Sequence, residues 1–187
     1  MPSSVRRTLA VCALLAWGAG VRAETIATTV KFARLEDYDT GTVLFDKAGG
    51  ETMAPASTSK LLVAEIVFHE LKEGRLKLDD KMHVSEFAWR TGGAHAHGSA
   101  MFLAVKSDVR VEDLLRGLIV QSGNDAALVL AEGLSGSEGN FVALMNKRAG
   151  ELGLTHCHFT NARGRSDAEE RVTAQDMVSL ARHLIRD

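Results

Sequence analysis

Ser57 and Lys60 are the residues whose types and spacing could do chemistry. Three positions apart, they share one face of a first helical turn, so the amine of Lys60 can reach the hydroxyl of Ser57. A serine hydroxyl is a good nucleophile only when a base removes its proton. Lys60 can be that base only when uncharged, so its pKa must fall by about three units from about 10.4. The pair predicts nucleophilic catalysis by Ser57; alone, it also fits an N-cap serine beside a solvated lysine.

A second polar element, Ser122-Gly123-Asn124, interrupts an otherwise apolar stretch between residues 114 and 130. A polar loop between two buried helical segments needs partners for its hydroxyl and amide. Alone, it fits a turn whose serine and asparagine cap the next helix. Together, a Ser-x-x-Lys element followed by a Ser-x-Asn element is the pattern of β-lactamases and penicillin-binding proteins.

The chain resembles the low-molecular-mass penicillin-binding D-alanyl-D-alanine carboxypeptidases of serine peptidase family S11. The resemblance extends from about Ile26 to the last residue. It implies an α+β fold of the serine β-lactamase/D,D-transpeptidase type. The runs that carry it are 56–60, 107–117, 119–126, 144–146, 151–154 and 173–177.

Site roles follow from the resemblance, position by position. It implies that Ser57 is the acylated nucleophile and Lys60 its general base. Ser122 would relay a proton to the leaving D-alanine, and Asn124 would bind the substrate backbone and help orient Lys60. The implied reaction is hydrolysis of the terminal D-Ala-D-Ala bond of peptidoglycan pentapeptides through an acyl-enzyme. β-Lactam antibiotics would acylate the same serine, and neither a cofactor nor a metal is expected.

One element of the family pattern, Lys-Thr-Gly, does not occur in these 187 residues. In the family it lies on a sheet strand that follows the last helix of this chain. Only two strands are expected here, at 30–35 and 42–45 around a turn at 39–41, and a two-stranded ribbon is marginal alone. We therefore expect a truncated domain, with part of the sheet plus the helical region, little or no activity and an exposed sheet edge.

Two further departures from the family pattern are local. Arg165 follows Gly164, where the family usually has leucine, and the loop containing His95 and His97 looks longer than usual. That loop could alter substrate preference. The alternatives left open are a D,D-endopeptidase of the same family and a non-catalytic remnant that binds peptidoglycan.

The remaining elements are expected from periodicity and caps. A buried helix should run from Ser57 through 60–71 to Gly74, and the segment 79–98 should be rich in loops. A helix at 111–120 has Ser107 or Asp108 as its expected cap. Further helices are expected at 125–132, at 137–152 and from Thr173, which has a capping-box spacing to Asp176, to the end of the chain.

Two rival functions rest on other side chains. A β-lactamase would need a deacylating base, for which Glu169 and Glu170 lie in the right region, but the Glu-x-x-Leu-Asn run typical of class A is absent. A metal site could use His95 and His97, or His156-Cys157-His158. Neither group has a recognised zinc spacing, so solvated loop histidines are the preferred interpretation.

The composition and the first 23 residues indicate where the protein acts and which partners it lacks. A formal net charge of −2 and the lack of a basic cluster argue against a nucleic-acid partner. Arg6 and Arg7, an apolar stretch at 9–19 and a small-residue site at 21–23 predict a signal peptide at 1–23. The domain would then be 24–187, with Cys157 as its only cysteine and no internal disulfide. We expect export to the periplasm or cell wall space, with membrane anchoring only through a segment beyond residue 187.

Overall fold

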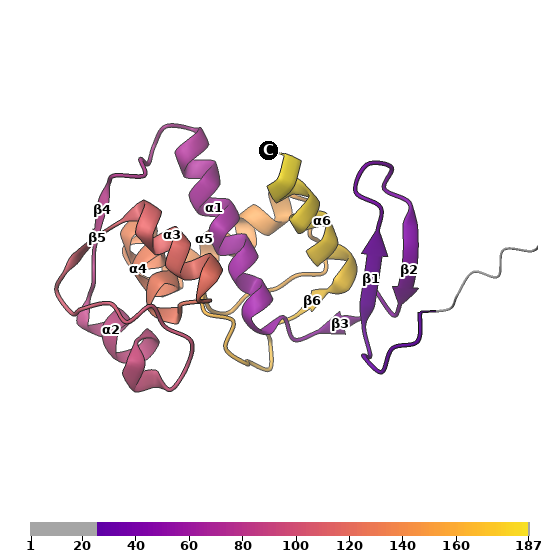
Figure 1. Cartoon of the computed structure of the whole chain (residues 1–187), viewed down its shortest axis with the longest axis horizontal. Coiled ribbons are helices and arrows are strands. Elements are labelled where there is room, and N and C mark those ends of the chain that lie inside the picture. Colours follow the sequence, from indigo (N-terminus) through magenta and orange to yellow (C-terminus); the bar gives the residue numbers. More distant parts are fainter. Residues whose placement is uncertain (1–25, 187) are drawn as a thin grey trace, which may run out of the picture.

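The computed structural model describes residues 26–186, so the predicted signal peptide lies outside the described residues. The described part combines helices with three two-stranded antiparallel sheets, whose strands pair as β1–β2, β3–β6 and β4–β5. Figure 1 shows the helices around α1 and the β1–β2 ribbon at one end, beyond α6. The elements are β1 (Ala33–Glu36), β2 (Val43–Lys47), β3 (Thr52–Met53), η1 (Ala56–Ser59), α1 (Lys60–Lys72), β4 (Lys81–His83), α2 (Glu86–Gly92), η2 (Ala94–Ala96), β5 (Asp108–Arg110), α3 (Val111–Val120), α4 (Asn124–Ser135), α5 (Glu138–Glu151), β6 (Val172–Thr173) and α6 (Ala174–Arg186).

Helix α1 is the centre of the helical region, as its nearly all-round apolar sequence predicts. It contacts α3, α4, α5 and α6, and Leu62, Val63 and Val67 are completely buried. The chain leaves the helix at Gly74, which has a φ of 70° that favours glycine. The predicted start was slightly wrong, because Ser57 lies in the 3₁₀ turn η1 and the α-helix begins at Lys60.

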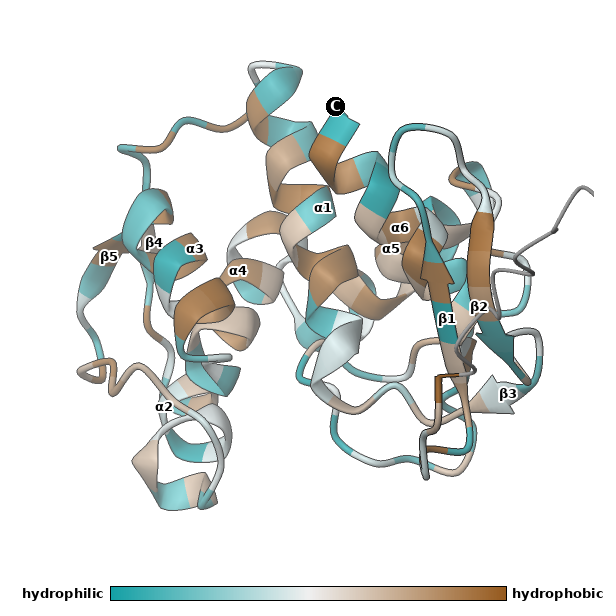
Figure 2. Cartoon of the chain, turned by 45° about the vertical axis from the view of Figure 1, so that its right-hand side comes forward, coloured by the Kyte–Doolittle hydropathy of each residue, from teal (hydrophilic) through white to brown (hydrophobic). Residues whose placement is uncertain are grey.

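The expected ribbon is present, with Ala33 opposite Lys47 and Leu35 opposite Phe45. Helix α6 packs on β1. No further strand was expected for this sheet, and none of the described strands joins the ribbon. The short pairs β3–β6 and β4–β5, which form elsewhere, were not predicted. Leu35 and Leu44 are 47% and 58% exposed, and Figure 2 shows hydrophobic stretches on both strands.

The segment 79–98 is more regular than its composition predicts. It contains β4, the helix α2 and the short η2 turn. The hydroxyl of Ser85 caps α2 by accepting a hydrogen bond from the Ala88 N–H at 2.9 Å. Strand β4 pairs with β5, which is distant in sequence, so its regularity comes from a partner that local patterning does not reveal.

Helix α3 spans 111–120 as predicted, but its predicted cap was wrong. Its N-cap is Arg110, which makes no side-chain cap bond. Asp108 instead lies in β5, where its carboxylate is 3.0 Å from Nδ1 of His83. Ser107 donates its hydroxyl proton to the carbonyl of Ala104.

The last helices match their predicted signals in part. Ser137 caps α5 by accepting from the N–H of Asn140 at 3.2 Å. At the start of α6 the hydroxyl of Thr173 accepts from the N–H of Asp176 at 3.0 Å. The carboxylate of Asp176 turns away to accept from the N–H of His156, so only half of the predicted capping box forms.

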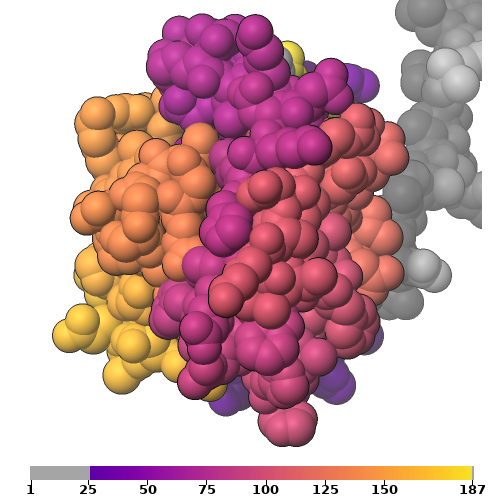
Figure 3. Space-filling view, turned by 90° about the vertical axis from the view of Figure 1, so that its left-hand side faces the viewer, coloured from indigo at the N-terminus to yellow at the C-terminus, as the bar shows by residue number. Residues whose placement is uncertain are grey.

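The face opposite the ribbon is built mainly from the middle of the chain. Figure 3 shows it in the magenta to orange colours of that part, with the yellow C-terminal segment at one edge. Among residues 26–186, no helix has both the length and the apolar character needed to cross a bilayer.

Candidate active site

Ser57 and Lys60 lie within hydrogen-bond distance at the junction of η1 and α1. The Nζ of Lys60 is 3.3 Å from the Oγ of Ser57 and donates to the carbonyl oxygen of Arg163 at 2.6 Å. Ser57 is exposed, whereas Lys60 is only 5% exposed. The hydroxyl is therefore open to a ligand, while the amine beside it is held inside the protein.

Burial alters the proton affinity of Lys60 in the direction that base catalysis needs. Desolvation is the main cause, and repulsion from Arg163 adds to it, so the pKa of Lys60 falls from 10.5 to about 8. Attraction to Glu170 opposes the fall. With a pKa near 8, about one Lys60 amine in ten is uncharged at pH 7. The sequence argument required a fall of similar size.

Ser59, which directly precedes Lys60 and could compete with Ser57 as the nucleophile, makes a different contact. It is completely buried, and its hydroxyl donates to the carbonyl of Ala56 at 3.0 Å. Ala56 itself has a φ of 48°, in the region that non-glycine residues rarely adopt. The turn therefore directs Ser59 inward and leaves Ser57 as the accessible hydroxyl.

Ser122 lies on the same open cavity of about 320 Å³ as Ser57 and Lys60, between α1 and α3. It too has a positive φ, 53°, which is a strained conformation of the kind that functional sites retain. The apolar part of the wall comes from both helices. The lining residues are Ser57, Thr58, Lys60, Leu61, Ala64, Leu118, Ile119 and Ser122.

Asn124, the fourth predicted residue, is not part of this cavity wall. It begins α4, and its N–H donates to the carbonyl of Ser99 at 2.8 Å. Its amide nitrogen lies so close to Gly98 that a Cβ there would be 2.7 Å away. Within residues 26–186 no hydrogen bond links the Asn124 side chain to Lys60, so the structure brings three of the four predicted side chains together.

A loop between α5 and α6, residues 159–170, packs against the Ser57–Lys60 turn. We call it the 159–170 loop. His158 and Arg171 close its base by pairing their backbones, with N–O distances of 2.8 and 3.0 Å. Gly164, with a φ of 69°, lies so close to the turn that a Cβ would be 2.1 Å from the carbonyl oxygen of Ala56. The guanidinium of Arg163 also binds Glu138 at the start of α5.

Glu170 is a buried carboxyl at the end of this loop, 4% exposed, and its Oε1 has no hydrogen-bond partner. Desolvation, followed by repulsion from Asp167, raises its pKa to about 7. Hydrogen bonds from Asn161 and the Thr160 backbone and attraction to Lys60 oppose the rise. Its neighbour Glu169 is exposed. The sequence named both glutamates only within the rival β-lactamase interpretation and could not tell them apart.

Asp125 was missed by the sequence argument. It is completely buried, and its carboxylate accepts from the N–H groups of Met101 and Leu103 at 3.0 and 3.1 Å. It therefore fixes the loop before β5 to the start of α4, next to Ser122. Its position directly after the Ser-Gly-Asn element and before an apolar run was the available signal.

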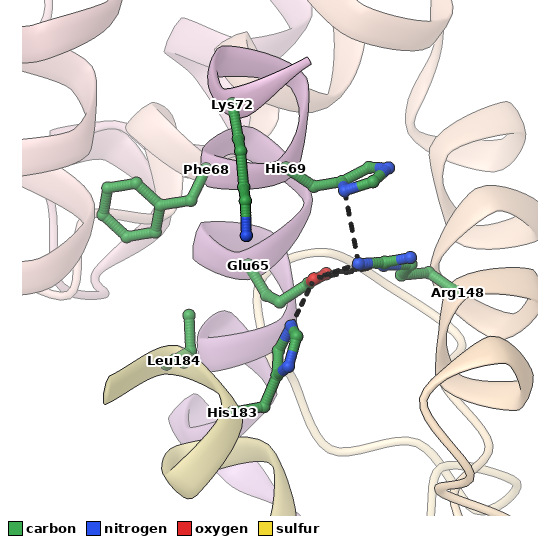
Figure 4. A pocket seen from close by; sticks show the side chains of 7 residues that line it. All are labelled: Glu65, Phe68, His69, Lys72, Arg148, His183 and Leu184. Atoms are coloured by element: carbon green, nitrogen blue, oxygen red, sulfur yellow. Dashed lines mark hydrogen bonds and ion pairs between the residues drawn. The ribbon is translucent and has the colours of Figure 1, made fainter. Parts of the chain in front are cut away.

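A separate cavity of about 350 Å³ lies farther along α1, and Figure 4 shows the side chains that line it. Glu65 is 2% exposed and accepts from Arg148 of α5 at 2.6 Å, and its Oε1 is 3.1 Å from Nε2 of His183 of α6. Glu65 is eight residues after Ser57, or roughly 12 Å along a helix. The Glu65 group links three helices and is too distant to act on Ser57.

The candidate metal ligands are dispersed. The ring of His95 packs edge-on against Trp89, with centroids 4.5 Å apart, and His156 is 3.4 Å from Asp176. Burial, followed by the nearby Asp176 carboxylate, raises the pKa of the Cys157 thiol to about 12, so the thiol is protonated at neutral pH. In the described part of the chain, no group of three or more His, Cys, Asp or Glu residues is arranged to hold a metal ion.

Comparisons with known proteins identify relatives across nearly all of the described residues. A family model described as D-alanyl-D-alanine carboxypeptidase, Peptidase S11, matches residues 20–187. The chain is 38% identical to the D-alanyl-D-alanine carboxypeptidase DacF of Bacillus subtilis over 89% of its length, covering 42% of that protein. It is 40% identical to DacC of Escherichia coli over 82% of its length, covering 38% of that protein.

Solved structures agree with these sequence relatives. The carboxypeptidase DacD of Francisella tularensis superposes with a TM-score of 0.84 at 36% identity, over 89% of this chain and 39% of that one. Penicillin-binding protein 5 of Haemophilus influenzae superposes with a TM-score of 0.79 at 36% identity, over 87% of this chain and 47% of that one. The expected α+β transpeptidase-like fold is confirmed. The chain spans about two fifths of the length of the first two sequence relatives.

Proposed function

Because the chain belongs to the D-alanyl-D-alanine carboxypeptidase family S11, we propose that it carries the nucleophile half of a serine carboxypeptidase site. Its substrate class is the D-Ala-D-Ala end of peptidoglycan stem peptides, and β-lactams are its covalent inhibitors. The observation that carries the proposal is the 3.3 Å contact between the buried amine of Lys60 and the exposed hydroxyl of Ser57.

The reaction begins when uncharged Lys60 accepts the proton of Ser57 and the serine oxygen attacks the carbonyl carbon of the scissile amide. The backbone N–H of Ser57 donates to the oxyanion that forms, a type of contact worth about 2.7–4 kcal/mol. Ser122, on the same cavity wall, passes the proton to the leaving D-alanine nitrogen. Water then hydrolyses the acyl-serine ester and regenerates the hydroxyl.

Asn124 has the least support among the four proposed residues. It directly precedes the buried Asp125 and follows Ser122 by two positions, but its amide lies against Gly98. We propose that it binds the substrate backbone after a change of side-chain rotamer. An Asn124→Ala variant that labels as fast as the parent chain would remove it from the proposal.

A second candidate function is non-catalytic binding of peptidoglycan, for which the open cavity of about 320 Å³ beside Ser57 offers a site. Such a protein would retain the cavity beside Ser57 but not complete the acyl transfer. A D,D-endopeptidase would use the same serine–lysine chemistry on a cross-linked substrate. We assign either activity to the periplasm or cell wall space, in line with the signal peptide predicted at 1–23.

Labelling by a fluorescent penicillin distinguishes these functions. The enzyme proposal expects a covalent adduct on Ser57, detected by peptide mass spectrometry, that Ser57→Ala abolishes. Ser59→Ala is the matched control, since Ser59 is buried and bound to Ala56. Release of D-alanine from a pentapeptide then measures turnover. If the chain binds pentapeptide but forms no adduct, the non-catalytic function is correct and the enzymatic one is wrong.

A further inference from the structure

Two buried ionisable groups, Lys60 and Glu170, are coupled electrostatically near the nucleophile, and the reaction as proposed uses only one of them. Lys60 is the general base, whereas Glu170 is 4% exposed and has an oxygen with no hydrogen-bond partner. A buried carboxyl oxygen without a hydrogen-bond partner is costly, so its retention needs an explanation. Glu170 also attracts Lys60 electrostatically, and the attraction is felt by both groups.

We propose that Glu170 is a positioning residue that sets the protonation of Lys60 through the 159–170 loop. The inference rests on the proposed function only in taking Lys60 as the base. The loop contacts the Ser57–Lys60 turn at two points. Its Arg163 carbonyl accepts from the Nζ of Lys60 at 2.6 Å, and Gly164 is pressed against Ala56.

Few other charges face this pair among the described residues. Arg163 repels Lys60, but its guanidinium is paired with Glu138 of α5 at 3.1 Å. Asp167, on the same loop, is exposed and repels Glu170. Ionised Glu170 therefore keeps Lys60 charged, and neutral Glu170 releases it to act as a base. The carboxyl works through Lys60 and does not itself touch the substrate.

The direct test is the titration of Lys60 by NMR in the whole chain with ¹³Cε/¹⁵Nζ-labelled lysine, assigned by its loss in Lys60→Met. In Glu170→Gln, which removes the charge and keeps the shape, we expect the midpoint to fall by roughly 0.5–1 pH unit. Glu169→Gln is the matched control, because Glu169 is the exposed neighbour, and it should leave the midpoint unchanged. An unchanged midpoint in Glu170→Gln, or an equal shift in both variants, overturns the proposal.

Reciprocity gives a second measurement that does not require the Glu170→Gln variant to fold. Coupling between two protonation sites is equal in both directions. Lys60→Met should therefore raise the Glu170 midpoint, followed by its side-chain ¹³Cδ resonance, by the same amount. If the titration midpoint of Glu170 is the same in the parent chain and in Lys60→Met, the two groups are not coupled and the proposal is wrong. Penicillin labelling is a separate readout: if the parent chain never acylates, the proposed function fails while the two titrations still decide the coupling.

Discussion

At the residue scale, the site depends on two side chains that burial shifts toward their uncharged forms. Lys60 has a pKa near 8 and Glu170 a pKa near 7, so both change charge within about one unit of neutral pH. A free lysine and a free glutamate would both be fully charged there. Their burial has a cost in stability, since a charged group is best solvated by water. In return, Lys60, the proposed base of Ser57, is partly uncharged at neutral pH.

The first prediction concerns the pH dependence of acylation. With a pKa near 8, the uncharged fraction of Lys60 rises about ninefold from pH 6 to 7 and about fivefold from pH 7 to 8. The rate of penicillin acylation should rise in parallel and level off above about pH 8. Stopped-flow labelling across this range measures it. Lys60→Arg, whose guanidinium stays charged, should lose at least a hundredfold in rate at every pH. A flat profile would exclude Lys60 as the base.

The second prediction concerns stability and pH. The pKa of Glu170 is raised on folding, so its stabilising contribution is complete below about pH 4.5 and is lost as pH rises through about 7. The Glu170→Gln variant has no carboxyl to ionise, so it lacks this loss. Its free energy of unfolding relative to the parent chain should rise by about 2–3 kcal/mol between pH 4.5 and pH 8. Urea unfolding at the two pH values measures the difference. Equal pH dependence in the two proteins would contradict a buried, destabilised carboxylate.

At the element scale, helix type and position were largely predictable, whereas the loops were not. The apolar surfaces of α1 and α3 and the cap of α5 are local signals, and their bounds came close. The 159–170 loop has no periodicity. Its shape depends on a backbone pair between His158 and Arg171 and on contact with η1, which is distant in the sequence. The burial of Glu170 follows from that contact, so sequence alone could not separate it from Glu169.

The third prediction tests how tightly this loop packs against η1. Gly164→Ala adds a Cβ that would collide with the Ala56 carbonyl, in addition to strain from a φ of 69°. Gly74→Ala is the matched control, because Gly74 has a φ of 70° and open space around it. We expect about 1 kcal/mol of destabilisation for Gly74→Ala and at least about 2 kcal/mol for Gly164→Ala. Equal losses in thermal unfolding would mean that the contact is loose.

At the scale of the whole molecule, α1 joins two separate groups of buried charge. Ser57 and Lys60 lie at its start, and Glu65 binds α5 and α6 farther along, through Arg148 and His183. Helix α1 was predictable as the core, but the Glu65 group was not, because its partners lie far apart in the sequence. The pairing of β3 with β6 and of β4 with β5 likewise depends on long-range contacts.

The fourth prediction concerns this network. Glu65→Ala leaves Arg148, whose side chain is 16% exposed, without its main partner and should destabilise the protein by about 3–5 kcal/mol. Glu70→Ala removes a comparable contact to Arg75, whose side chain is 51% exposed, and should cost less than about 1 kcal/mol. Chemical denaturation compares the two. Similar small losses would show that the Glu65 group does not hold α1, α5 and α6 together.

The carbonyl of Arg163 that accepts from Lys60 belongs to a segment without regular secondary structure. Any fluctuation that lifts this segment would admit water to the amine, restore its affinity for a proton and leave the serine inert. The fraction of molecules that can react is therefore limited to those in which this segment is packed against Lys60. Amide hydrogen exchange at residues 163–165 and the acylation rate should therefore respond together to temperature and denaturant.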